Sequence, residues 1–266
     1  MSVSHTAPPA RAPGPGAGPA TGAANGSPNS RYVWCAPRAA GSGTRTNAER
    51  MCGRCGCRGR AAGDFPQRPA ELRTLLGAGG VVPHPPVPPQ MWLLGAGRES
   101  ARLAGLLGTD FAFGHFFSQA GGPEAFDDYR SQFRRTTGRP AGGALAVRVV
   151  TADIAGRAEE PAQSLLLWRA RKDLGQDAQL PSYETTRRHR WTGAEPERAR
   201  VHRTALVSGA PEQVYAVLTA LAAAHGVDEL IVNTLTADPA DRRRSYELLA
   251  ETFELPADRR EAAVTA

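Results

Sequence analysis

The pattern of apolar residues that begins at Met91 changes its spacing twice. Residues 91–95 form an uninterrupted apolar run, which is typical of a strand covered on both faces. Apolar residues at helical spacing follow over 99–107, and Gly108 stands where a helix usually ends. A second apolar run over 110–114 predicts another strand. Because parallel strands need a crossover between them, we expect a βαβ unit in this part of the chain.

The same alternation of helical and extended patterns continues to the C-terminal region. The further predicted elements are helix 123–134, strand 144–151, helix 159–173, helix 211–225, strand 228–234 and helix 240–253. Residues 176–204 are polar and rich in arginine, so we predict an insertion or a mobile loop there. Strands that alternate with helices predict an α/β protein with a parallel sheet, here with four strands and four or five helices.

The first third of the chain lacks this patterning. Residues 1–62 are dominated by Pro, Gly, Ala, Ser and Arg, a composition that buries too little apolar surface to offset the entropy of ordering, so we predict disorder. Residues 63–90 combine a short helical pattern with a proline-rich connector. We therefore expect a disordered basic region at 1–62, the connector at 63–90, one α/β domain at 91–256 and a tail at 257–266.

Charge is distributed unevenly along the chain. The formal net charge is +6, and the excess lies in residues 1–88, where Glu49, Asp64 and Glu71 are the only acids. A basic segment can bind nucleic acid through phosphate contacts, but residues 54–60 have no interleaved aromatic side chains to stack on bases. We expect no nucleic-acid partner.

Two further features bear on the location of the protein. No apolar run approaches the roughly 18–20 residues of a membrane span, and no signal peptide is recognisable at the N-terminus. We expect a cytoplasmic protein without a membrane partner.

Four cysteines raise the question of a metal site. Cys35, Cys52, Cys55 and Cys57 suffice in number for tetrahedral zinc. The last three fall within six residues, however, and no apolar residues surround them to build a small core. We predict no metal site, and in a cytoplasmic chain no disulfide framework.

The turn after the first predicted strand is a candidate anion site. Small residues there let a ligand approach the backbone, and the start of a helix presents free N–H groups and a positive dipole end. Arg98 adds a guanidinium that can balance a phosphate. The predicted phosphate-binding residues are Gly95, Ala96, Gly97, Arg98 and Ser100. The alternative is an ordinary βα turn that contains glycine for conformational reasons.

Polar residues at strand ends are further candidates. His115 follows the second predicted strand, where a neutral imidazole can act as a general acid or base; the alternative is a solvated loop histidine. Asn233 and Thr234 end the last strand, where they can bind a ligand or cap a turn. His189 and His202 lie in the polar insertion, and we expect them on the surface.

Five segments, taken in order, resemble the luciferase-like monooxygenase superfamily of flavin-dependent oxidoreductases. They are MWLLGAGRESARLAGLLGTDFAFGHFF, EAFDDYRSQFR, LAVRVVTADIAGRAEEPAQ, SGAPEQVYAVLTALAAAHGVDELIVNT and DRRRSYELLAE. The resemblance covers roughly residues 63–256. It implies a TIM (β/α)8-type barrel of which this chain carries only the last four βα units, because a complete barrel takes about 250 residues and residues 1–62 match no first half.

The resemblance also implies an enzyme. Reduced FMN, or a deazaflavin in its place, would act with oxygen on a small organic molecule, and a separate flavin reductase would supply the reduced flavin. The flavin phosphate would bind at the turn that contains Gly97, and His115 would lie at the catalytic end of the barrel.

Two alternatives concern a truncated chain. A half barrel could be a non-catalytic remnant or an assembly module, for example a homodimer. Residues 1–62 could also come from an out-of-frame or mis-started translation of a GC-rich gene.

Overall fold

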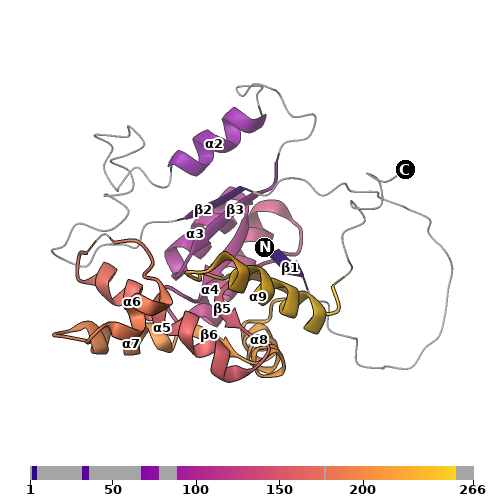
Figure 1. Cartoon of the computed structure of the whole chain (residues 1–266). Coiled ribbons are helices and arrows are strands. Elements are labelled where there is room, and N and C mark those ends of the chain that lie inside the picture. Colours follow the sequence, from indigo (N-terminus) through magenta and orange to yellow (C-terminus); the bar gives the residue numbers. More distant parts are fainter. Residues whose placement is uncertain (1, 5–31, 36–66, 78–88, 177, 256–266) are drawn as a thin grey trace, which may run out of the picture. The chain divides into compact units, whose positions relative to one another are not determined.

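The computed structural model of the 266-residue chain describes residues 2–4, 32–35, 67–77, 89–176 and 178–255 (Figure 1). Its backbone separates into two compact units, which are described one at a time. The N-terminal unit comprises residues 6–113 and 121–144. The C-terminal unit comprises residues 1–5, 114–120 and 145–266.

The N-terminal unit is built on parallel strands with helices between them. Its strands are β2 (Tyr32–Cys35), β3 (Met91–Gly95) and β4 (Asp110–Gly114), and its helices are α2 (Gln67–Gly77), α3 (Arg98–Leu107) and α4 (Gly122–Thr137). Strand β3 pairs in parallel with both β2 and β4, with Met91 opposite Tyr32 and Trp92 opposite Asp110. Helix α3 is the crossover between β3 and β4, so the predicted βαβ unit is confirmed.

Aromatic side chains form the core of this unit. The ring of Phe111 on β4 lies 5.6 Å from that of Phe126 and 5.4 Å from that of Tyr129, both on α4, centre to centre. All three residues are fully buried, and the Tyr129 hydroxyl donates to the Thr109 carbonyl at 3.3 Å. The Phe111 and Phe126 rings pack edge to face, which stabilises the pair beyond the area that it buries.

Helices α3 and α4 approach each other closely at Gly105. A Cβ atom at this position would lie 2.7 Å from Cβ of Gln132 and 2.9 Å from the backbone nitrogen of Phe133. Only glycine allows this spacing between the two helices. Gly108, with φ of 64°, then ends α3 in the left-handed conformation that glycine adopts without a steric cost.

The C-terminal unit has the remaining strands and helices. They are β1 (Ser2–Ser4), β5 (Ala144–Thr151), α5 (Ala155–Asp173), α6 (Tyr183–Arg188), α7 (Glu195–Arg203), β6 (Leu206–Gly209), α8 (Pro211–His225), β7 (Glu229–Asn233) and α9 (Pro239–Thr252). Strand β5 pairs in parallel with β6, with Arg148 opposite Leu206. Strand β1 pairs antiparallel with β7, with Val3 opposite Leu230.

Helix α5 packs its small residues against β5. Val150 of β5 is buried in one cluster with a face of α5 that is made of alanine and leucine at helical spacing. The buried members are Val150, Ala158, Ala162, Leu165, Leu166, Ala170, Ala199 and Leu206. Small side chains let the helix lie close to the strand, so the core of this unit is compact.

The predicted parallel α/β class is confirmed, and the predicted elements downstream of residue 90 are present with ends that differ by up to four residues. A short helix is also present within 63–90, as expected, while most of the proline-rich connector lies outside the described residues. That the strands are the last four units of a (β/α)8 barrel stays a prediction, as do the predicted domain limits.

Two expectations are wrong. Strand β6 was not predicted, because its four residues are too few to show an alternating pattern. The segment 176–204, expected as an insertion or a mobile loop, contains helices α6 and α7, which carry no apolar stripe and form ion pairs with α5. Strands β1 and β2 lie within residues 1–62 and pair with β7 and β3; disorder of that region stays a prediction. The rest of that region lies outside the described residues.

Within the described ranges, no helix is both long and apolar enough to cross a bilayer.

Candidate functional site

The turn between β3 and α3 has the local structure of an anion site. Gly97 is the N-cap of α3, and its carbonyl accepts the N–H of Ala101 at 3.2 Å. Glycine has no side chain that could cap the helix, and the described residues supply no other acceptor for the N–H groups of residues 98–100. These donors and the positive end of the helix dipole face the open end of the turn.

The turn is also accessible. A Cβ atom at Gly97 would meet no other atom within 4 Å, and its φ of −162° is extended backbone that any residue adopts. Ser100 is half-buried in the first helical turn. Free donors, a hydroxyl and open space together fit a phosphate group.

Arg98 is engaged elsewhere. Its guanidinium contacts Asp128 on α4 through two nitrogens, at 2.7 and 3.0 Å, and Arg102 contacts the same carboxylate at 3.1 Å. The hydrogen bond from Arg98 lowers the pKa of Asp128. Glu99, an exposed acid, lies in the same helical turn. A phosphate at this turn would therefore depend mainly on backbone N–H groups, and the role of Arg98 as its counter-cation stays a prediction.

His115, in the C-terminal unit, is buried rather than solvated. His115 is 6% exposed. Its backbone N–H donates to the Ala146 carbonyl at 3.0 Å, and its backbone carbonyl accepts from the Gln119 side chain at 3.1 Å. The alternative of a solvated loop histidine is therefore wrong.

The His115 imidazole has an unusual environment. Its Nδ1 atom is buried and has no hydrogen-bond partner among the described residues. The ring lies 6.4 Å from that of His225 at an interplanar angle of 84°. Burial lowers the pKa of His115, and His225 lowers it further, so the imidazole is neutral at pH 7. His225 was missed in the sequence because it lies 110 residues away at the end of α8.

The strand ends of the C-terminal unit are bonded to α9. Thr151 donates its N–H to the Ser245 hydroxyl at 3.1 Å and its own hydroxyl to the Gly209 carbonyl at 2.9 Å. The Thr234 N–H donates to the Tyr246 hydroxyl at 3.2 Å, while the Thr234 hydroxyl is buried with no partner in the described part of the chain. The backbone bond of Thr234 favours the structural alternative for this residue.

His189 and His202, expected on the surface, are partly buried, and each contacts a carboxylate. His189 Nε2 lies 2.7 Å from Glu195, and His202 Nε2 lies 2.7 Å from Asp173; the two side chains are 16% and 13% exposed. Arg171 Nη2 lies 3.2 Å from His189 Nδ1 and so donates to it, which leaves Nε2–H to donate to Glu195.

Burial would raise the pKa of Glu195, but hydrogen bonds outweigh it. The Thr192 N–H donates to its carboxylate at 3.0 Å, and His189 and Arg171 also contact it. The pKa of Glu195 therefore lies below its ordinary value. The network joins α5 to the start of α7, which is a structural role.

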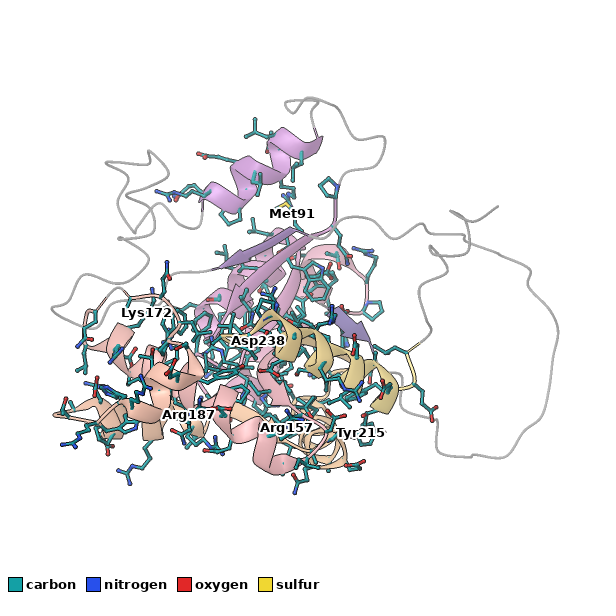
Figure 2. All side chains as sticks on the ribbon, viewed as in Figure 1. Met91, Arg157, Lys172, Arg187, Tyr215 and Asp238 are labelled. Atoms are coloured by element: carbon teal, nitrogen blue, oxygen red, sulfur yellow. The ribbon has the colours of Figure 1, made fainter. Side chains whose placement is uncertain are left out.

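A cavity of about 350 Å³ lies in the N-terminal unit, at the ends of β3 and β4 that are opposite to the glycine turn. Met91 lines it at the start of β3 (Figure 2), together with Asp110, Arg73 of α2 and Arg139 beyond α4. The amino ends of parallel strands usually serve stability, whereas ligands bind at the carboxyl ends. The turn at Gly97 is therefore the better candidate site.

No three His, Cys, Asp or Glu side chains in the described ranges are placed to hold a metal ion. Cys52, Cys55 and Cys57 lie outside those ranges.

With this geometry established, comparison with known proteins defines the class. The family model for luciferase-like monooxygenases matches residues 62–229, well over half of the chain. The chain belongs to the luciferase-like monooxygenase family.

Individual relatives support this family assignment. YwcH of Bacillus subtilis (strain 168) is 35% identical over 173 residues, which are 64% of this chain and 52% of YwcH. N-acetyl-S-alkylcysteine monooxygenase from the same organism is 27% identical over 197 residues, 71% of this chain and 55% of that protein. The crystal structure of apo-MsnO8 shares 32% identity with a TM-score of 0.61, over 73% of this chain and 61% of that one. The chain spans about half the length of the curated relatives that it matches.

Proposed function

We propose that this chain is a flavin-dependent oxidoreductase of the monooxygenase type, which binds the phosphate of FMN at the β3–α3 turn. One observation carries the proposal: the first turn of α3, directly after a parallel strand, presents N–H groups without an acceptor. The chain that carries this turn belongs to the luciferase-like monooxygenase family. The backbone at Gly95, Ala96 and Gly97 would approach the phosphate, and the N–H groups of residues 98–100 would bind its oxygens.

Side chains at the turn would contribute less than the backbone. The Ser100 hydroxyl is half-buried beside the free donors and would add one hydrogen bond. Arg98 would have to share its guanidinium between the phosphate and Asp128. When bound, reduced flavin supplies the electrons and the reaction with oxygen, and the protein positions it and excludes water.

His115 is our proposed proton carrier. Its imidazole is neutral, and its Nδ1 atom has no other hydrogen-bond partner in the described part of the chain, so it can accept a proton from a reacting group. We expect His115→Gln to lower kcat for substrate oxidation while the dissociation constant of FMN stays the same.

The remaining assignments follow from family membership. We propose a small organic molecule as substrate, in keeping with the relative named N-acetyl-S-alkylcysteine monooxygenase. A separate reductase would supply reduced flavin, because no nicotinamide-binding glycine fingerprint follows a strand in this sequence. We propose that the protein acts in the cytoplasm and that a deazaflavin is the alternative cofactor.

The phosphate site can be tested by comparing FMN with riboflavin, which lacks the phosphate. Gly97→Asp places a carboxylate at the N-cap, where it occupies the free N–H groups and repels a phosphate. The open space around Gly97 accepts the new side chain, so α3 should be as stable as before or more stable. We expect wild-type protein to bind FMN more tightly than riboflavin. We expect Gly97→Asp to raise the dissociation constant of FMN about 100-fold, which is equivalent to the loss of one or two charge-assisted hydrogen bonds.

Gly156→Asp is the matched control. Gly156 lies in the first turn of α5, also has open space around it, and takes the same change of charge. It should leave both dissociation constants unchanged. Equal binding of FMN and riboflavin by the wild type would overturn the phosphate site. No binding of FMN or of a deazaflavin would overturn the whole proposal in favour of a non-catalytic remnant or assembly module.

A further inference from the structure

Arg148 is a cation inside the C-terminal unit. It lies on β5, two residues before Val150, so both side chains are on the same face of the strand. Val150 is buried in the cluster formed with α5. Arg148 therefore projects from β5 into the layer between strand and helix, where an apolar residue is expected.

The neighbours of Arg148 do not balance its charge. Its guanidinium lies 5.0 Å from the centre of the Phe116 ring, and its Nε atom is buried with no hydrogen-bond partner in the described ranges. No carboxylate in those ranges forms an ion pair with it. A cation–π contact alone replaces only part of the hydration that a guanidinium loses on burial.

A second arginine adds to the excess positive charge: Arg169 lies on α5 next to Ala170, which is buried in the same cluster as Val150 of β5. Arg169 on α5 also has a buried Nε atom without a partner in the described part of the chain. Its Nη2 atom lies 3.4 Å from Asp173, but this carboxylate is also bound to His202 at 2.7 Å. Burial, and then the charge of Arg169, lower the pKa of Arg148 to about 10.

We propose that Arg148 and Arg169 form a binding site for a small oxyanion, separate from the flavin-phosphate turn. The Nε atoms without partners are donors without acceptors, and the planar fork of a guanidinium matches the oxygens of a phosphate or a carboxylate. An anion would remove the repulsion between the two arginines and satisfy their donors. The chemistry fits inorganic phosphate or the carboxylate of a small organic acid.

The test measures unfolding of the full chain in chloride, phosphate and acetate at matched ionic strength. The variant Gly97→Asp serves as background, because it removes the proposed phosphate site of the N-terminal unit and leaves only the arginine pair. We expect phosphate or acetate to raise the unfolding temperature of this background, and the more effective anion identifies the chemistry of the site.

Arg148→Met distinguishes a binding site from a structural arginine. In chloride we expect Arg148→Met to be more stable than its parent, because an unpaired buried charge is replaced by an apolar chain of similar length. Its affinity for the effective oxyanion should fall about tenfold or more, equivalent to one charge-assisted hydrogen bond. Arg148→Lys keeps the charge without the fork and should lie between the two.

Arg243→Met is the matched control. Arg243 lies on α9 of the same unit and is 77% exposed, with one contact of 3.6 Å to Glu247. It should keep the full response to the anion. The proposal is overturned if neither anion stabilises the background protein, if Arg148→Met responds as its parent does, or if Arg148→Met is equally destabilised in all three salts.

Discussion

The α3–α4 region (residues 91–137) and the α5–α7 region (residues 155–204) are both largely helical, but different forces hold their helices in place. In the first, Gly105 lets two helices touch and buried aromatic rings fill the space below them. In the second, α7 buries only the small side chain of Ala199 in the α5 cluster, and ion pairs such as Arg187 with Glu160 and Arg171 with Glu195 join α6 and α7 to α5. Figure 2 shows the dense cover of polar side chains around Lys172 and Arg187.

This difference explains why the helices of the first region could be predicted from the sequence, whereas α6 and α7 could not. An apolar stripe is a local pattern, because each helix carries its own. An ion pair is not local, because neither partner reveals the other in the sequence. The two regions should therefore respond differently to the removal of steric fit and to the removal of charge.

The largest effect is expected at the close contact between helices. Gly105→Ala puts a Cβ atom 2.7 Å from Gln132 and 2.9 Å from backbone, so α3 and α4 must separate. We expect a loss of about 2–3 kcal/mol in the free energy of unfolding, as for other overpacked cores. Urea unfolding measures it.

Gly156→Ala on α5 is the control in the other region. A Cβ atom there meets nothing within 4 Å, so alanine should stabilise its helix by up to about 1 kcal/mol. Effects of the same sign at both positions would contradict the comparison.

The next effect concerns charge in the α5–α7 region. Glu195→Gln removes the buried carboxylate that Thr192, His189 and Arg171 contact, and we expect a loss of about 1–2 kcal/mol at pH 7. Glu197→Gln, on the same helix but 62% exposed, should cost less than about 0.5 kcal/mol. A similar loss of free energy of unfolding in both variants would show that burial of the Glu195 network does not stabilise the fold.

The same variant makes a prediction about pH. Because the pKa of Glu195 is below its ordinary value of 4.5 in the folded protein, its charge stabilises the fold above that pH. This contribution is lost as the pH falls through the lowered pKa. The difference between the wild type and Glu195→Gln should therefore shrink in acid, and a constant difference would contradict the assignment.

The smallest effect is expected at His115. Its pKa is lowered in the folded state, so below the ordinary value of 6.5 the unfolded chain binds more protons than the folded one. Stability should fall as the pH falls from 6.5 through the lowered pKa, and His115→Gln should reduce this fall. Unfolding between pH 8 and pH 5, above the range where carboxylates titrate, isolates the effect; identical profiles for both proteins would contradict it.

Much of the fold could be predicted because its signals are local. Leucines at helical spacing and Gly108 define α3, a continuous apolar run defines β3, and a run interrupted only by Arg148 and ending in Thr151 defines β5. The turn at Gly97 could be predicted for the same reason, since a strand, small residues and a helix start follow one another directly.

The missing parts depend on residues that are distant in the sequence. The pairing of Arg98 with Asp128 spans 30 residues, and the closeness of His115 to His225 spans more than a hundred. The burial of Arg148 contradicts the ordinary preference of its side chain, so no propensity reveals it. Candidate residues could be named from the sequence, but their actual partners could not.

The most direct test of the central claim is an FMN titration of the ¹⁵N-labelled chain that follows the backbone amide signals of Arg98, Glu99 and Ser100. If these N–H groups bind the flavin phosphate, their shifts should be among the largest in the protein and should be absent with riboflavin. Shifts that are concentrated elsewhere, or equal with the two flavins, would contradict the account.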